Sequence, residues 1–298
     1  MAASILPTRK HGKVAVLAFI IAVIAVIVLL TALSSASLLF VVAVAPSVFL
    51  LWYFYHADKY KHESKRLLGG TFLIGAMSTI PAMFIEGAYS EPSLSAGIFA
   101  VFVYFLLGVG LVEEFMKFLS VRVYAYRSKQ FDEPMDGIVF GVAAALGFAT
   151  VENILYVLLN GLETGVIRAI VSVPGHTFWG AIMGFYLGEA KARGRPRLAV
   201  YGLAIVVFLH GLYDTVNAIL PGWVALVAML AIVWIVYFKV VKKEIAEAEA
   251  ESPYESKPSN PPPRQPTTTL GPTRVCPQCG NAVQAGTKFC VVCGQRVT

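Results

Sequence analysis

Seven side chains with acid, base or hydrogen-bonding chemistry stand inside long apolar runs of this sequence. A charged side chain at the middle of a bilayer-spanning helix costs about 3 kcal/mol even on the scales derived from insertion experiments. Such residues therefore face the interior of a helix bundle, where they pair with one another and mark functional sites. The seven candidates are Glu113, Glu114, Glu152, Asn153, His176, His210 and Asp214.

The spacing of these residues predicts which of them share a helical face. Glu113 and Lys117 are four residues apart, as are His210 and Asp214, so the members of each pair can contact each other along one helix. Glu114 is rotated by about 100° from Glu113 and is predicted to point away from Lys117, toward a water molecule or a metal ion.

The depth of each candidate in its apolar run predicts that all of them meet. At about 1.5 Å per residue from the basic end of each run, Glu113 and Glu114 lie about 12–14 Å deep and Glu152 about 22–24 Å deep. His176 and His210 each lie about 18 Å deep by the same count. The sequence therefore predicts one polar cavity, built by four helices, close to the middle of the membrane.

Two chemistries suit this set of residues, and both hydrolyse a peptide bond. A glutamate can act as a general base on the water that attacks an amide carbonyl. In the alternative, His176 and His210 together with a glutamate bind a catalytic divalent metal, which lowers the pKa of that water. Asn153 is predicted to donate hydrogen bonds to the oxyanion in either case. Residue types alone leave the two routes open and do not decide which of Glu113 and Glu114 is the base. Because Glu113 shares a face with Lys117, we expect Glu113 to position and Glu114 to activate the water.

The composition excludes a soluble protein as the scaffold for these residues. Of the 298 residues, 57% are hydrophobic and only 14% are charged, which is too little polar cover for a soluble surface. The pattern is typical of an all-α polytopic membrane protein in contact with a lipid bilayer. Apolar length predicts about eight transmembrane helices, near residues 14–33, 37–55, 69–88, 96–121, 136–159, 165–188, 198–219 and 222–241.

The basic residues predict the orientation of the chain. The formal net charge is +6, and the Lys and Arg residues gather before the first span, in every second loop and after the last span. By the positive-inside rule, both termini lie in the cytoplasm, here of a prokaryotic plasma membrane. This distribution serves membrane orientation, so we expect no nucleic-acid partner. Glu86 and Arg168 lie near the outer, non-cytoplasmic ends of their spans and are predicted to be interfacial residues.

The C-terminal part of the chain has a different character from the membrane domain, residues 1–243. Residues 244–274 form an acidic and then Pro-rich segment that is predicted to be a disordered linker. Residues 275–298 contain two Cys-x2-Cys pairs, separated by ten residues and each followed by glycine, which predicts a zinc ribbon with a structural zinc ion. Its four ligands are Cys276, Cys279, Cys290 and Cys293.

Taken together, the membrane motifs resemble those of a known family. Glu-Glu-x-x-Lys at Glu113, Phe-Ala-Thr-Val-Glu-Asn ending at Asn153, the lone His176 and His-x3-Asp at His210 are similar to the PrsW family of intramembrane proteases, within the CAAX-protease and bacteriocin-processing superfamily. In the wider superfamily the last motif is His-x3-Asn, whereas Asp214 fits the PrsW branch. The resemblance covers about residues 40–240. It implies an intramembrane endopeptidase that cleaves membrane-anchored proteins such as anti-sigma factors.

Two other functions are compatible with buried carboxylates and histidines. Proton- or ion-coupled transporters also use such relays, although they usually show two inverted halves, and no such symmetry is visible in this sequence. A non-enzymatic membrane scaffold with the zinc ribbon as its adaptor is the other alternative. That scaffold would tolerate substitution of the buried polar residues.

Overall fold

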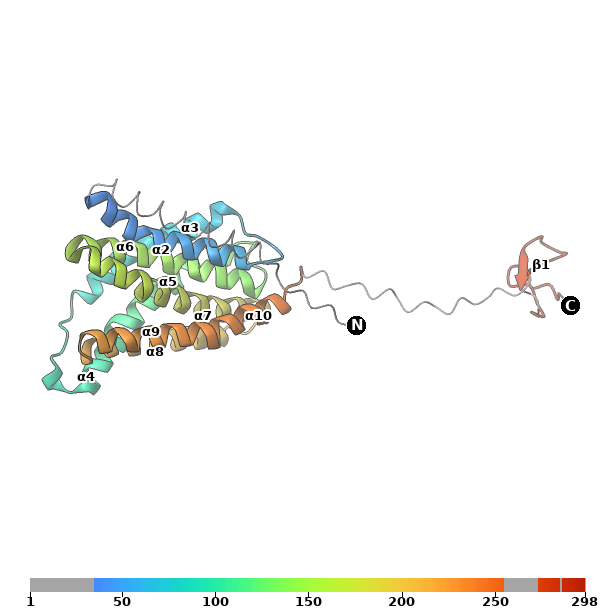
Figure 1. Cartoon of the computed structure of the whole chain (residues 1–298). Helices are drawn as coiled ribbons and strands as arrows, with labels where there is room; N and C mark the ends of the chain where they lie inside the picture. The colour runs from blue at the N-terminus through green and yellow to red at the C-terminus, as the bar shows by residue number, and fades with distance from the viewer. Residues whose placement is uncertain (1–34, 255–272, 285, 298) are drawn as a thin grey trace, which may run out of the picture. The chain divides into compact units, whose positions relative to one another are not determined.

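The computed structural model describes residues 35–254, 273–284 and 286–297. The predicted first span, residues 14–33, lies outside the described residues. The described chain falls into a helical membrane unit and a small C-terminal unit, and each is considered by itself. In the membrane unit, α2, α3 and α6 pack together, and α8 packs on α7 and α9 (Figure 1).

The helical elements of the membrane unit follow one another through short connections. They are α2 (Ser35–Ala57), α3 (Lys65–Glu86), the 3-10 turn η1 (Leu94–Ala96), α4 (Ile98–Val103), the π-helix η2 (Tyr104–Gly110), α5 (Leu111–Val123), the 3-10 turn η3 (Ala125–Arg127), α6 (Pro134–Ile170), α7 (Ser172–Ala192), α8 (Arg197–Ile219), α9 (Gly222–Val236), the π-helix η4 (Tyr237–Val241) and α10 (Lys242–Ala250).

Six segments of the described residues are long and apolar enough to cross a membrane, and the longest of them contains two predicted spans. This segment runs from Pro134 to Ala192 over 59 residues, about three times the length that one crossing needs. Gly161 inside it has φ 83° and ψ −168°. This conformation has a positive φ and is not helical, and glycine adopts it more easily than other residues do. Arg168 then donates a hydrogen bond back to Asn153, so the chain has reversed. The predicted break after residue 159 is found at this glycine.

Small residues let α6 lie at the centre of the bundle. The first half of α6 is buried almost continuously, which is unusual for a single helix and requires close neighbours on several sides. A Cβ atom at Gly141 would overlap the backbone of Gly180 in α7, and one at Gly147 would overlap the backbone of Phe72 in α3. The backbones of α3, α6 and α7 therefore meet directly, as is common where helices associate without a hydrophobic driving force.

Ion pairs and hydrogen bonds join the polar segments at one end of the bundle. Lys61, after α2, contacts Asp132, before α6, at 2.7 Å, and Lys191 of α7 donates to the carbonyl oxygen of Tyr126 at 2.6 Å. Arg193 contacts Glu251, after α10, at 2.7 Å. We call this end, formed by residues 58–64, 124–133, 193–196 and 251–254, the basic face. It is the face for which the positive-inside rule predicts the cytoplasm.

The π-helix η2 sets the position of the first glutamate pair. It leads directly into α5, whose first turn carries Glu113 and Glu114. Gly110 at its end lies against the backbone of α8: a Cβ atom there would come within 3.0 Å of the carbonyl oxygen of Val207 and 3.1 Å of the amide nitrogen of Gly211. This close approach puts the start of α5 next to His210. π-helical turns are frequent at functional sites, because they change which side chains face the interior.

Candidate active site

Lys117 is fully buried at the centre of the polar residues in the membrane. Its Nζ atom donates to Oε2 of Glu113 at 2.9 Å and to Oε1 of Glu114 at 2.8 Å. It also lies 2.9 Å from Nδ1 of His176, in α7. An ammonium group has no acceptor, so Nδ1 of His176 accepts this bond and the ring proton is on Nε2.

His176 is held on its other side by a second group of residues. Its Nε2 atom lies 2.9 Å from Oε2 of Glu152. Glu152 in turn contacts Nη2 of Arg168 at 3.0 Å, and Nε of Arg168 donates to Oδ1 of Asn153 at 2.9 Å. The amide of Asn153 donates to the carbonyl oxygen of Ala43 in α2 at 2.7 Å. A chain of contacts therefore fixes the imidazole from the surrounding helices.

His210 in α8 completes the group. Its Nδ1 atom lies 2.8 Å from Oε1 of Glu114, so the ring donates its Nδ1 proton to that carboxylate. Its Nε2 atom lies 3.3 Å from Oδ2 of Asp214 and 3.9 Å from Oε2 of Glu113. The two imidazole rings stand edge to face, with centroids 5.4 Å apart. The structure thus brings all seven candidate residues of the sequence into one connected group.

A cavity of about 710 Å³ lies beside this group of residues. Only the side chains that line it can contact a substrate. It reaches from the catalytic candidates to the loop after α3 and to the end of α8, so it opens toward the face opposite the basic face. Its polar lining includes Glu113, Glu152, His176, His210 and Asp214. Glu114, Lys117 and Asn153 are not part of the lining, and all three are completely buried.

Three expectations from the sequence are therefore corrected. Glu114 does not point away from Lys117, because residues three apart on an α-helix are also neighbours on its surface, so both carboxylates reach the ammonium. Asn153 is completely buried outside the cavity lining, with its amide held by Ala43 and Arg168, so it does not face an oxyanion in the cavity. Arg168 is not an interfacial residue, since the reversal at Gly161 folds it onto Glu152.

Glu86 is the other residue whose place the sequence does not predict. It stands at the end of α3 and lines the cavity, with one buried carboxylate oxygen that has no hydrogen-bond partner. Helix length places such a residue at the membrane boundary. The signal that would have identified Glu86 is the absence of any basic residue in the last turn of α3, which leaves the carboxylate to face the cavity.

The donor set also fits a divalent metal ion. One ligand atom from each of Glu113, Glu114, His176 and His210 lies within 4.8 Å of the others. Carboxylate oxygens and neutral imidazoles are the usual ligands of catalytic zinc, and Oε2 of Glu114 is buried without a hydrogen-bond partner. Lys117 shares three of these four ligands, so its ammonium and a metal would compete for the same atoms.

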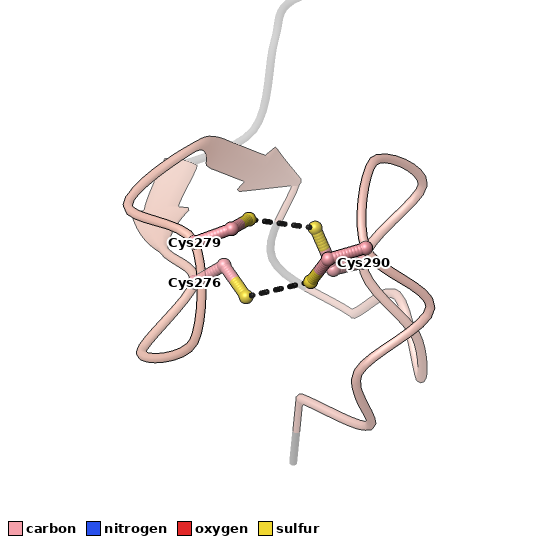
Figure 2. A group of neighbouring side chains, drawn as sticks. Cys276, Cys279 and Cys290 are labelled. Carbon is pink, nitrogen blue, oxygen red and sulfur yellow. Dashed lines mark hydrogen bonds between the residues drawn. The ribbon is translucent and has the colours of Figure 1, made fainter.

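The C-terminal unit has the geometry of a zinc site. Strands β1 (Thr273–Val275) and β2 (Ala282–Gln284) pair antiparallel and bring the two Cys-x2-Cys turns together (Figure 2). The Sγ atoms of Cys276 and Cys293 are 3.7 Å apart, as are those of Cys279 and Cys290. Tetrahedral zinc with Zn–S bonds of about 2.3 Å requires a separation of about 3.8 Å, whereas a disulfide requires about 2.05 Å. The cysteines therefore fit a metal and not a disulfide.

The polar environment of this unit supports thiolate ligands. The side-chain amide of Asn281 donates to Sγ of Cys279 at 3.4 Å and thereby lowers the pKa of the Cys279 thiol to about 6. A thiolate is the form that binds metal. Cys276 and Cys290 are buried with Val283 and Val297 in a core too small to fold without a metal.

These two sites define a membrane-embedded hydrolytic centre with a separate zinc-binding module. The profile of the PrsW family of intramembrane metalloproteases matches residues 63–241, and a zinc-ribbon profile matches residues 275–297. The chain belongs to the PrsW family.

Curated relatives agree with this assignment. A protease PrsW of Geobacillus kaustophilus is 38% identical over 225 residues, which is 72% of this chain and 96% of that protein. The protease PrsW of Bacillus subtilis is 38% identical over 184 residues, 61% of this chain and 83% of its own length. That of Clostridioides difficile is 30% identical over 206 residues, 66% and 87% of the two chains. No solved structure matches the chain.

The family settles the class of function. The protein is an integral membrane protease with a mostly helical fold, and it acts on a protein substrate in the membrane. The comparisons give no support to the transporter alternative, and a non-enzymatic scaffold does not agree with the protease family. The prediction of an intramembrane protease carrying a zinc ribbon is confirmed.

Proposed function

We propose that Glu113 is the carboxylate that activates water for peptide hydrolysis. It is the member of the glutamate pair that lines the cavity. Its Oε2 atom lies 3.8 Å from Nδ1 of His176 and 3.9 Å from Nε2 of His210, so a water molecule held between the rings would be within its reach. Glu114 is a positioning residue in this proposal, because it contacts Lys117 and His210 and not the cavity.

The two histidines have complementary roles. His176 accepts from Lys117 at Nδ1, whereas His210 donates from Nδ1 to Glu114 and turns its Nε2 atom toward the cavity. That nitrogen, Nε2, can hold a proton taken from water and return it to the leaving amine. Asp214, at 3.3 Å, would stabilise the imidazolium formed in this way.

A metal ion would be held by Glu113, Glu114, His176 and His210. When bound, such an ion supplies a water molecule whose pKa is lowered to near 7. Lys117 contacts Glu113, Glu114 and His176, so its ammonium would give up the ligand atoms that an ion takes. Glu152 and Asp214 then orient the imidazole ligands from outside, as carboxylates commonly do around metal-bound histidines.

The shape of the cavity favours a membrane-anchored substrate. The cavity extends from Glu113 to Glu91, in the loop after α3, and is open on the face opposite the basic face. With the basic face in the cytoplasm and both termini there, cleavage would take place in the outer half of the bilayer. Single-span proteins of the anti-sigma-factor kind, which the family resemblance implies, meet this requirement because an unwound end of their helix can enter from the outer side.

The proposal is tested by cleavage of a single-span substrate in proteoliposomes. Glu113→Gln should lower kcat by about 10³-fold with unchanged thermal stability, as expected for loss of a general base. The matched control is Glu91→Gln, which removes a carboxylate from the outer part of the same cavity and should keep nearly full activity. Mass spectrometry of the products should place the cleavage site in the outer half of the substrate span. Full activity of Glu113→Gln would refute the assignment.

A further inference from the structure

Five carboxylates gather on the basic face, far along their helices from the active centre. Asp58 follows α2 and Glu63 precedes α3, while the other three stand at or just before the start of α6. We call this group the acidic cluster: Asp58, Glu63, Asp132, Glu133 and Asp136. The proteolytic chemistry described above uses none of them.

The acidic cluster is buried but carries excess negative charge. Asp58, Glu63, Glu133 and Asp136 are each at most 3% exposed. Lys61 is the only cation that forms an ion pair with the cluster within residues 35–254, at 3.1 Å from Glu63, 2.7 Å from Asp132 and 3.7 Å from Asp136. Ionisation of all five carboxylates beside one ammonium would leave a formal charge of −4. Buried charges without compensation are strongly unfavourable, so a fully ionised cluster requires a further cation besides Lys61.

Backbone hydrogen bonds fix the orientation of two of these carboxylates. Oδ1 of Asp58 accepts from the amides of Tyr60 and Lys61, each at 3.1 Å. Oδ2 of Asp136 accepts from the amides of Asp132 and Glu133, at 2.7 and 2.9 Å. One oxygen of each carboxylate is thereby held in place, and the position of its second oxygen is defined by the same contacts.

The second oxygens have no partner. Oδ2 of Asp58 and Oδ1 of Asp136 are buried without a hydrogen-bond partner. The Glu133 side chain accepts from the Asp136 amide in the capping box of α6, which leaves its other lone pairs for a further partner. One carboxylate oxygen from each of the three residues lies within 4.8 Å of the other two. Two oxygens on opposite sides of a calcium ion are about 4.8 Å apart, at the usual Ca–O distance of about 2.4 Å. The three carboxylates are therefore close enough to share one cation.

We propose that Asp58, Glu133 and Asp136 bind a hard divalent cation, Ca²⁺ or Mg²⁺. All the donors are oxygens, and carboxylate oxygens are the ligands these ions prefer, whereas zinc and other soft metals prefer nitrogen and sulfur. The site is thus chemically distinct from the imidazole-containing active centre and from the four cysteines of the ribbon. The proposal does not depend on which residue activates water.

A cation at this place would tie two separate parts of the chain together. Asp58 belongs to the α2–α3 connection, whereas Glu133 and Asp136 stand at the start of α6. The hydroxyl of Tyr254, which follows α10, donates to Oδ2 of neighbouring Asp132 at 2.8 Å. The ion would therefore stabilise the basic face where these segments meet.

The test is a cation titration of the full-length protein in detergent, with the ribbon loaded with one equivalent of zinc. Ca²⁺ and Mg²⁺ are added separately, and binding is followed by thermal unfolding of the membrane unit and by displacement of Tb³⁺ luminescence. The variant Asp58→Asn/Glu133→Gln removes charge from two ligands without changing their size. The matched control is Glu163→Gln, an exposed carboxylate in α6 at the opposite face.

We expect saturable binding and a rise in Tm for the wild type and for Glu163→Gln, and at least tenfold weaker binding for the double variant. In EDTA the double variant should unfold at the same temperature as the wild type or higher, because it removes repulsion. His176→Ala should keep the cation response, which excludes the active centre as its source.

Equal affinity of the wild type and the double variant, or a wild-type protein that shows no saturable response to either ion, would overturn the proposal. If the double variant fails to fold, hydrogen exchange on the wild type decides. The cation should then protect residues 57–64 and 128–136 from exchange, and protection elsewhere or nowhere refutes the site.

Discussion

The active centre and the acidic cluster both bury several carboxylates, but they balance the charge in different ways. In the active centre, Glu113 and Glu114 share Lys117, and Glu152 contacts Arg168. Two imidazoles add further positive charge when they are protonated. In the acidic cluster, Lys61 forms ion pairs with three of the five carboxylates, and no other cation of residues 35–254 pairs with the cluster.

The difference follows from what each place can obtain from its surroundings. The middle of a bilayer offers neither ions nor water in quantity, so every compensating charge there must come from the protein. The basic face is in contact with solution, where divalent cations are available. A site at the surface can therefore rely on an ion that the sequence does not encode, whereas a site in the membrane needs Lys117 and Arg168 in the chain.

Lys117→Met gives the sharpest test of charge balance in the active centre. Removing the ammonium leaves Glu113 and Glu114 buried side by side, and breaking a buried ion pair from one side costs about 3–5 kcal/mol. We expect a large loss of thermal stability together with loss of cleavage. Chemical or thermal unfolding in detergent measures the first, and proteoliposome cleavage the second.

The double variant Lys117→Met/Glu114→Gln is the control for this prediction. It removes one of the two stranded carboxylates, so it should recover a substantial part of the lost stability, and the two substitutions should be strongly non-additive. Additive effects would mean that Lys117 does not neutralise Glu114, and the charge balance described here would be wrong.

Arg168→Met tests whether the outer contacts of the active centre matter for rate. Arg168 touches Glu152 and Asn153 but not the expected site of reaction, so it acts by positioning His176. Loss of such an outer partner typically costs about 10–100-fold in activity. We expect that reduction in kcat, with a smaller change in KM, measured on the same substrate.

Arg197→Met is the control for Arg168, because Arg197 is exposed at the start of α8. It should leave kcat unchanged. Conservative replacement by Arg168→Lys should restore part of the activity, since one charge contact with Glu152 remains while the bond to Asn153 is lost. Full activity of Arg168→Met would show that Arg168 does not position His176 for catalysis.

Lys61→Met should have a smaller effect and one that depends on the solution. Lys61 is partly exposed, so its ion pairs are screened and their loss costs about 1 kcal/mol. We expect a lower Tm in EDTA and recovery of most of the difference in millimolar Ca²⁺, because the ion replaces the missing positive charge. Lys65→Met, at an exposed position nearby, should show neither change. An equal decrease in Tm in EDTA and in Ca²⁺ would show that the effect of Lys61 does not depend on the proposed ion.

Much of this architecture is predictable from the sequence because the membrane limits the choices. Apolar length identifies the spans in the described part of the chain, and the ionisable residues inside them identify the active centre. Rotation about a helix axis is harder to predict. The π-helix η2 changes the register just before α5 and thereby the direction in which the whole first turn of α5 faces the other helices. A single widened turn leaves no clear signal in residue types.

Contacts between loops are even less visible in the sequence. Asp58 and Glu133 are polar residues in polar segments, and nothing in their spacing indicates that α2 and α6 bring them together. Arg168 was misjudged for a related reason, since its place depends on the reversal at Gly161. Sequence reasoning is strong where a residue contradicts its surroundings, as Glu113 does, and weak where a buried residue stands in an ordinary polar loop.

The zinc ribbon should have the least influence on the membrane unit. Its cysteines lie within 18 residues of one another and complete their own site. Cys276→Ser/Cys279→Ser should therefore abolish zinc binding by residues 273–297 and unfold that segment, because the metal supplies its folding energy. The Tm of the membrane unit should stay within about 1 °C, as expected for independent sites. Cleavage of a short single-span substrate should also be unchanged. If cleavage falls while the Tm is unchanged, the ribbon takes part in recruiting the substrate. Cleavage would then depend on the ribbon even though the stability of the membrane unit does not.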